Sequence, residues 1–143
     1  MTTDRLQEGI EVAGTARELT IGRILAFSGG PFGAPGWPAK NLHTDAGKAA
    51  EAGLSAPIVS GIQCEADIVR LLIRLFGEKA WFETGRLHVK YPRPVFADTA
   101  LVARARVRAR QASADGTKIE LEIWCDTPQK ETVVVGSASC IVR

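Results

Sequence analysis

The sequence has few of the features that mark membrane, metal-binding or disulfide-rich proteins. Its three cysteines, Cys64, Cys125 and Cys140, are odd in number and show no CxxC or Cys/His ligand spacing. This speaks against a disulfide framework or a metal site and predicts buried, reduced thiols. No stretch approaches the roughly 18 apolar residues that a membrane span needs, and the N-terminus lacks the apolar core of a signal peptide. We therefore expect a cytoplasmic protein that does not bind membranes.

A large excess of positive charge is also missing. The formal net charge is +2, whereas nucleic-acid-binding domains usually concentrate a much larger basic excess on one face. The hydrophobic fraction of 45% is typical of a globular protein, and 143 residues suffice for one core. We expect a single domain over 1–143, with one site for a small molecule and no nucleic-acid partner.

Glycine and proline are concentrated in residues 29–40, where an irregular loop is expected. Loops of this length are often functional. A short helix capped by Thr20 is expected before this loop, and a second one, capped by Thr44 or Asp45, after it. The longest helical pattern covers about residues 62–76 and predicts a central helix.

The second half of the chain alternates polar and apolar residues with the period of two that strands require. Small residues, Ala103, Ala105 and Ala109, line one face of the second strand and leave room for the central helix. Helices followed by long antiparallel strands predict an α+β fold in which one sheet wraps one helix. The expected strands cover about 86–91, 101–110, 118–125 and 132–142, with Trp81 and Phe82 at the start of the first one.

At 100° per residue, the central helix carries a polar stripe that we expect to face water, formed by Gln63, Asp67, Arg70 and Arg74. Glu65 lies on the opposite, apolar side of the helix. A carboxylate taken out of water is costly unless it is paired or protonated, which makes Glu65 a candidate acid/base. Alternatively, Glu65 lies half solvated in a frayed first turn, near the positive end of the helix dipole.

Of the two histidines, His43 is the stronger candidate for proton transfer. It follows the glycine- and proline-rich loop, and loops held by a scaffold often position reactive groups. An imidazole can accept and donate protons near neutral pH. His88 shares the outward face of a predicted strand with Arg86 and Lys90 and is interpreted as a surface residue.

Four motifs follow one another over about residues 17–110. They are Arg17-Glu18-Leu19-Thr20, Asn41-Leu42-His43-Thr44-Asp45, Pro57-Ile58-Val59-Ser60-Gly61 and Tyr91-Pro92-Arg93-Pro94-Val95-Phe96-Ala97-Asp98-Thr99. Their order and spacing resemble those of the MaoC-like hydratases. The resemblance implies a hot-dog fold, in which an antiparallel sheet wraps the central helix and two protomers form sites between them. It also implies hydration of 2-enoyl thioesters or dehydration of 3-hydroxyacyl thioesters.

In that family an aspartate five residues before the histidine activates water, the histidine is an acid/base, and a backbone amide at the helix start polarises the thioester carbonyl. The resemblance maps the histidine onto His43 and the amide onto Gly61. The sequence departs from the family pattern in two places. Pro38 stands at the aspartate position, and Ser60 replaces the histidine before the glycine.

Three interpretations of the missing aspartate stay open. In the first, Glu65 supplies the carboxylate and pairs with His43, while Asn41 or Gln63 orients water or the carbonyl. In the second, one acid/base group suffices for an isomerisation, cyclisation or elimination of a thioester. In the third, the chain is a non-catalytic partner that completes the site of another subunit. A hydratase/dehydratase is the leading expectation, and a hot-dog thioesterase is an alternative.

The resemblance further implies a homodimer or a higher homo-oligomer, with a heteromer as the alternative. Coenzyme A or phosphopantetheine is part of the substrate, so that no separate cofactor or metal is expected. Lys90 and Arg93 lie near the expected tunnel mouth and are candidates for binding coenzyme A phosphates. Ser60 is a candidate polar contact of the substrate, and Trp37 either lines an acyl pocket or pins the loop.

Alternate residues from Arg104 to Arg110 are arginines and resemble a phosphate-binding patch. However, Glu120 and Glu122 have the same outward parity on the following strand and can pair with them across the hairpin. Each exposed pair contributes at most about 1 kcal/mol. We interpret this stripe as a solvated ladder of charges.

Overall fold

The computed structural model describes residues 5–143. No helix in this part of the chain is long and apolar enough to cross a membrane. The elements, in chain order, are β1 (Glu11–Ala13), β2 (Arg17–Leu19), α1 (Ile21–Ser28), α2 (Ala46–Glu51), α3 (Gly61–Phe76), α4 (Glu78–Thr84), β3 (Arg86–Lys90), β4 (Thr99–Ser113), β5 (Gly116–Asp126) and β6 (Thr132–Val142).

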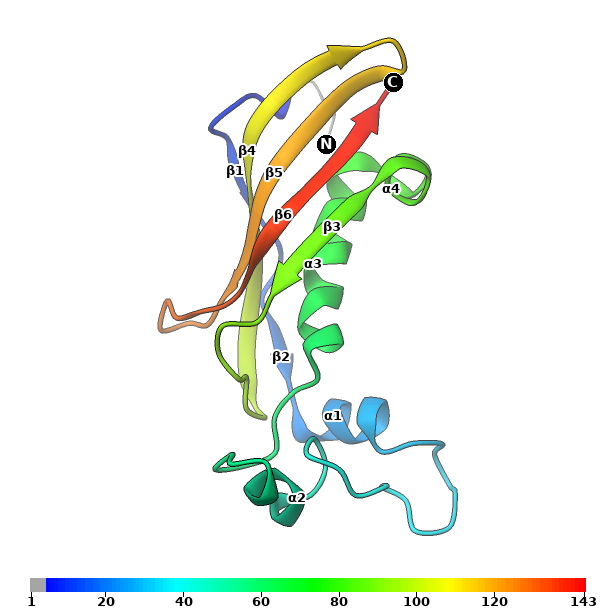
Figure 1. Ribbon diagram of the computed structural model, residues 1–143, viewed down its shortest axis with the longest axis vertical. Helices are drawn as coiled ribbons and strands as arrows, with labels where there is room; N and C mark the ends of the chain where they lie inside the picture. Colours follow the sequence, from blue (N-terminus) through cyan, green and yellow to red (C-terminus); the bar gives the residue numbers. More distant parts are fainter. Residues whose placement is uncertain (1–4) are drawn as a thin grey trace.

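Within the described residues, six strands form one antiparallel sheet in the order β1-β4-β5-β6-β3, and β2 pairs with another part of β4. The long hairpin of β4 and β5 continues into β6, and β3 returns to pair with β6. The sheet curves around α3 (Figure 1). The expected α+β architecture, an antiparallel sheet wrapped around a central helix, is confirmed.

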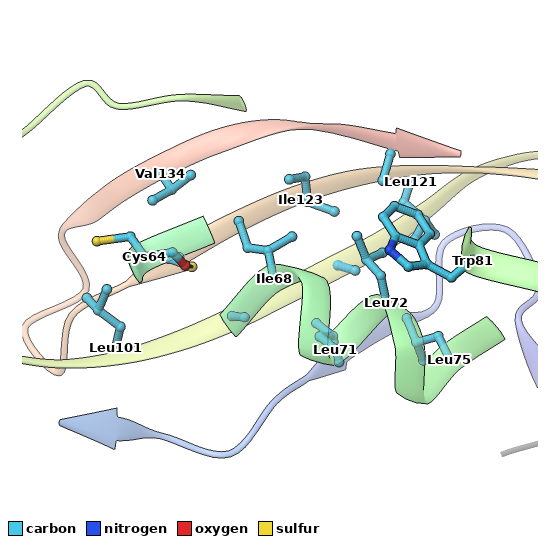
Figure 2. Packing of buried hydrophobic residues seen from close by; sticks show 14 of the residues in the cluster. Cys64, Ile68, Leu71, Leu72, Leu75, Trp81, Leu101, Leu121, Ile123 and Val134 are labelled. Atoms are coloured by element: carbon cyan, nitrogen blue, oxygen red, sulfur yellow. Dashed lines mark hydrogen bonds between the residues drawn. The ribbon is translucent and has the colours of Figure 1, made fainter. Parts of the chain in front are cut away.

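The core lies between α3 and the concave face of the sheet (Figure 2). Ala103 and Ala105 on β4 are 2% and 0% exposed, as expected for small residues under the helix. Burial of this apolar surface is the main favourable contribution to folding. The helix contributes Cys64, Ile68, Leu71, Leu72 and Leu75, which face sheet residues that include Leu101, Leu121, Ile123 and Val134.

The capping residues expected from the sequence occur where predicted. The Thr20 hydroxyl accepts a hydrogen bond from the Arg23 N–H at the start of α1, and the Asp45 carboxylate accepts one from the Lys48 N–H at the start of α2. Each bond satisfies one of the N–H groups that a helix start leaves unpaired. The loop at 29–40, between these helices, contains no regular element.

The prediction that Gln63 and Asp67 face water is wrong, because both are buried, at 7% and 6% exposed. Arg17 of β2 pairs with Asp67, with 2.9 Å between Nε and Oδ1. The Gln63 side-chain amide donates to the Arg23 carbonyl of α1 at 3.2 Å. β2 and α1 therefore cover the polar side of α3, which a helical wheel of α3 alone cannot predict.

Trp81 and Phe82 belong to α4 and not to the start of a strand, which corrects the sequence prediction. Gly77, at φ 82°, ends α3, and the good helix formers that follow start a new helix. Trp81 is buried and stacks on Phe76 with 6.4 Å between ring centroids, whereas Phe82 is exposed. Trp81 thus joins the core.

A bulge on β4 ends the alternation that the sequence predicts. The register shifts between Val107 and Ala109, so that Ala109, expected to face inward, is partly exposed. The predicted ladder of charges is confirmed for Glu122, which forms ion pairs with two of the arginines. It is wrong for Glu120, whose carboxylate pairs with Lys118 on its own strand.

Candidate functional site

A cavity of about 400 Å³ lies at the N-terminal end of α3. Three chain segments that are far apart in the sequence build most of its wall, and they are the segments that carry the motifs at 41–45, 57–61 and 91–99. The convergence of these motifs makes this cavity the candidate functional site. Its lining residues are His43, Ile58, Val59, Ser60, Gly61, Ile62, Cys64, Tyr91, Arg93, Pro94, Val95 and Val133.

Backbone hydrogen bonds hold these segments together. The Ile58 N–H donates to the Leu42 carbonyl at 3.3 Å, and the Val59 N–H donates to the Val95 carbonyl at 2.7 Å. An isolated antiparallel bridge also joins Ile58 and Phe96. The segment that leads into α3 is therefore fixed between the loop of His43 and the segment after β3.

The imidazole of His43 has one ring nitrogen already bound. Its Nδ1 lies 2.8 Å from the Ile58 carbonyl oxygen, which can only accept a hydrogen bond. The proton of the neutral ring is thus held on Nδ1, and Nε2 carries the free lone pair. Because His43 lines the cavity, this arrangement presents a group that can accept a proton there.

Asn41 supports the His43 loop. Its Oδ1 accepts a hydrogen bond from the His43 backbone N–H at 2.8 Å, and its Nδ2 donates to the Ser28 carbonyl at 2.8 Å. Both polar atoms of the side chain are used within the protein, and Asn41 does not line the cavity. The structure thus places Asn41 behind His43, where it holds the backbone of this loop.

The start of α3 leaves backbone N–H groups available in the cavity. Ser60 is the N-cap, but its side chain makes no capping hydrogen bond. Within residues 5–143, the N–H groups of Gly61 and Ile62 have no hydrogen-bond partner. Unpaired N–H groups at the positive end of a 16-residue helix can bind a carbonyl oxygen on which negative charge develops.

Tyr91 is a cavity residue that the sequence analysis did not single out. Its ring packs on Gly61, where an added Cβ would lie 2.9 Å from the Tyr91 Cζ atom, so that a larger residue at position 61 would displace the ring. Its hydroxyl donates to Oε2 of Glu65 at 2.9 Å. Burial, together with the hydrogen bond and charge of Glu65, raises the pKa of Tyr91 to about 12, so that the phenol stays protonated near neutral pH.

Glu65 is half-buried and does not line the cavity. Its contact with the cavity runs through Tyr91, which lies 26 positions later in the chain. The sequence contains only one tyrosine, and it stands at the start of the motif at 91–99. This is the signal in the sequence that could have pointed to Tyr91 as the partner of Glu65. Periodicity on α3 alone could identify Glu65 but not the residue that pairs with it.

The other predicted site residues are spread over a wider region. Arg93 lines the cavity and forms no ion pair within the described residues. Lys90 is exposed at the end of β3 and lies outside the cavity lining. Gln63 is also outside it, bound to α1. Trp37 packs against Phe32 in the loop, with the rings tilted by 60° and 4.7 Å between their centroids, and it does not line the cavity.

Cys64 and His88 carry other groups that could act as a nucleophile or a base, and neither is suited to that role in this cavity. Cys64 lines the cavity, but burial, and then the charge of Asp67, raise the pKa of its thiol to about 12, so that it is not a thiolate near neutral pH. Like Cys125 and Cys140, it is free and buried, as the sequence predicts. His88 is exposed on β3, also as predicted, and lies outside this cavity.

Comparison with known proteins places these features in context. Residues 39–124 match the family described as MaoC like domain. No curated protein matches the sequence significantly. The structure resembles several solved structures at identities of 20% or less, which shows a shared fold.

Three of these structures illustrate which kinds of protein share this fold. The MaoC-like dehydratase from Rhodospirillum rubrum is 19% identical over 97% of this chain and 94% of that one, with a TM-score of 0.77. The (R)-hydratase from A. caviae involved in PHA biosynthesis is 20% identical over 97% and 98%, with a TM-score of 0.66. The ChsH1-ChsH2 complex from Mycobacterium tuberculosis gives 13% identity over 96% and 98%, with a TM-score of 0.69.

Proposed function

This chain belongs to the MaoC-like domain family, and on that basis we propose that it is a lyase that hydrates a 2-enoyl thioester or dehydrates the 3-hydroxyacyl form. The observation that carries the proposal is that His43 and Gly61, at the start of α3, line the same cavity. A dehydratase and an (R)-hydratase among the solved structures with this fold support the reaction class. The site combines a proton acceptor with a donor for the carbonyl oxygen.

In the hydration direction, Nε2 of His43 takes a proton from water as the water oxygen bonds to C3 of the enoyl group. The π electrons move toward C2 and the thioester carbonyl oxygen, which the N–H of Gly61 binds. The proton on His43 then moves to C2, and the imidazole returns to its neutral form. One acid/base group balances the protons, although Pro38 replaces the family's aspartate. Glu65 supplies a carboxylate that contacts this site through the Tyr91 hydroxyl.

The cavity suits an acyl thioester of modest size. Its volume of about 400 Å³ lies in the usual range of small-ligand sites, roughly 300–1,000 Å³. Apolar side chains from Ile58 to Val133 form much of its wall and would contact the acyl group. Arg93, with Lys90 nearby, would bind phosphates of coenzyme A or of a carrier protein's phosphopantetheine. The coenzyme is then part of the substrate, and the reaction needs no separate cofactor.

A non-catalytic role in a heteromer is the second candidate, because Pro38 removes the family's carboxylate. The ChsH1-ChsH2 complex, which has this fold, is a precedent for a complex of two different chains. A thioesterase, isomerase or cyclase would use the same cavity with a different outcome. These alternatives differ in the product formed, which makes them separable by experiment.

The test is a panel of crotonyl- and longer enoyl-coenzyme A thioesters incubated with the purified protein. We expect loss of the conjugated enoyl absorbance, and a decrease in kcat of about 100-fold or more for His43→Ala. His88→Ala is the matched control, because His88 is exposed and lies outside the cavity. Release of free thiol without hydration would instead indicate a thioesterase. No reaction with any thioester would favour the non-catalytic role.

A further inference from the structure

Tyr91 occupies a position from which it can contact the reacting groups. It lines the same cavity as His43, and its ring covers Gly61, the residue whose N–H binds the thioester oxygen in the proposed reaction. It is 45% exposed, so that its hydroxyl is not sealed inside the core. The reaction proposed above assigns no role to this phenol.

The hydrogen bonds already present decide what the phenol can do. A tyrosine hydroxyl has one hydrogen, and that hydrogen is donated to Oε2 of Glu65 at 2.9 Å. The hydroxyl therefore has only lone pairs left for a further partner. His43 is in the same condition, because its Nδ1 proton is donated to the Ile58 carbonyl and Nε2 can only accept. The cavity thus contains two acceptors with fixed roles.

We propose that the Tyr91 hydroxyl is a further catalytic group, which accepts a hydrogen bond from the water that His43 deprotonates. Glu65 is then a positioning residue that acts through Tyr91 by holding the phenol hydrogen. This inference rests on the proposed hydration reaction. It replaces the family's water-binding aspartate with a tyrosine and a carboxylate from two other segments of the chain.

In the proposed reaction, His43 and Tyr91 together orient one water molecule. One hydrogen of the water points to Nε2 of His43, the other points to the Tyr91 oxygen, and a lone pair remains to attack C3. Only the hydrogen on the His43 side moves, first to the imidazole and then to C2. Tyr91 and Glu65 keep their protonation states throughout, in agreement with the raised pKa of about 12 for Tyr91.

Three variants test these roles through kcat and KM. Tyr91→Phe keeps the ring on Gly61 and removes the hydroxyl, and we expect kcat to fall about 10-fold, equivalent to one hydrogen bond, with KM nearly unchanged. Glu65→Leu removes the acceptor for the phenol hydrogen and should match Tyr91→Phe. Glu65→Gln keeps an acceptor oxygen and should retain activity within about threefold.

A second measurement does not depend on catalysis. Because the chain contains a single tyrosine, its tyrosinate absorbance reports the ionisation of Tyr91 alone. We expect the folded protein to remain in the phenol form near pH 11, about one unit above the ordinary pKa. In Glu65→Leu the ionisation should move to lower pH.

The outcomes separate the two proposals. A wild-type enzyme that is active while Tyr91→Phe is equally active would overturn the role of Tyr91 and leave the proposed function intact. Equal losses in Glu65→Gln and Glu65→Leu would show that the charge of Glu65 is needed, and would overturn its positioning role. A wild-type protein inactive on every thioester would overturn the hydration reaction, and the water-binding role with it. An ordinary tyrosine titration that does not respond to Glu65→Leu would overturn the inference by itself.

Discussion

At the scale of single residues, hydrogen bonds within the protein already occupy the donor hydrogens of the candidate site. The carbonyl of Ile58 fixes the proton of His43 on Nδ1, and Glu65 holds the hydrogen of Tyr91. Asn41 has both side-chain polar atoms bound and holds the His43 backbone in place. These contacts leave Nε2 of His43 and the Tyr91 oxygen as hydrogen-bond acceptors, and they leave no polar atom of the Asn41 side chain free.

The raised pKa values of the buried thiols predict how the free energy of unfolding depends on pH. Burial raises the pKa of Cys64 from 9.0 to about 12 and also raises the pKa of Cys125. The unfolded chain releases these protons near pH 9, whereas the folded chain keeps them. The resulting stability is present in full below pH 9 and is lost as the pH rises toward 12, by about 1.4 kcal/mol per pH unit for each thiol at most. Urea denaturation, followed by tryptophan fluorescence at several pH values, measures this loss.

A double variant, Cys64→Ala and Cys125→Ala, is the control for this prediction. It removes the two thiols and should reduce the slope of the unfolding free energy against pH in the alkaline range, leaving the part that the raised pKa values of Tyr91 and Cys140 contribute. It is less stable at neutral pH because two buried side chains become smaller. A slope equal to that of the wild-type protein would assign the pH dependence to other groups.

At the scale of elements, the contact between α3 and β4 depends on small side chains. Ala105 is completely buried, at 0% exposed, and Ala103 is 2% exposed on the same face. The helix presents large residues such as Leu71 and Leu72 toward the sheet (Figure 2). Close packing of this kind leaves no space for additional atoms on the strand.

We therefore expect Ala105→Leu to lower the free energy of unfolding by about 1–3 kcal/mol, because the added side chain overpacks the core. Ala112→Leu, at an exposed position of the same strand, is the matched control and should change stability by no more than about 0.5 kcal/mol. Chemical denaturation followed by circular dichroism measures both. Equal effects of the two substitutions would contradict this account of the packing.

At the scale of the whole molecule, β3 forms one edge of the sheet. Within the described residues, β3 pairs with β6 on one side and with no strand on the other. An unpaired edge strand can pair with a strand of another chain. Near the candidate site, Ile62 and Phe96 are exposed at 63% and 37%. Both features are compatible with a second copy of the chain on this side.

We predict that the active form is a homodimer, as the family resemblance implies. Light scattering after size exclusion, at the concentrations used for the activity assay, should give twice the mass of the chain. Hydrogen exchange should show protection of the β3 amides that face away from β6. A particle with the mass of a single chain that is fully active would contradict this prediction.

The sequence by itself determined the elements whose causes are local. The caps at Thr20 and Asp45, the helix at 61–76 and the alternation of the strands after residue 86 depend on residues a few positions apart. The family resemblance of the motifs also predicted His43 and Gly61 as site residues, and both line one cavity. Such features can be read along the chain because capping and periodicity act over one or two turns.

Only the tertiary structure decided the contacts between distant segments. Arg17 and Asp67 are 50 positions apart, and their ion pair buries a side of α3 that the helical pattern assigned to water. The pairing of Glu65 with Tyr91 likewise exists only because β3 ends beside the start of α3. Periodicity describes one element at a time, whereas burial and hydrogen bonding depend on the element that packs against it. The geometry of the candidate site is therefore a property of the assembled sheet and helix.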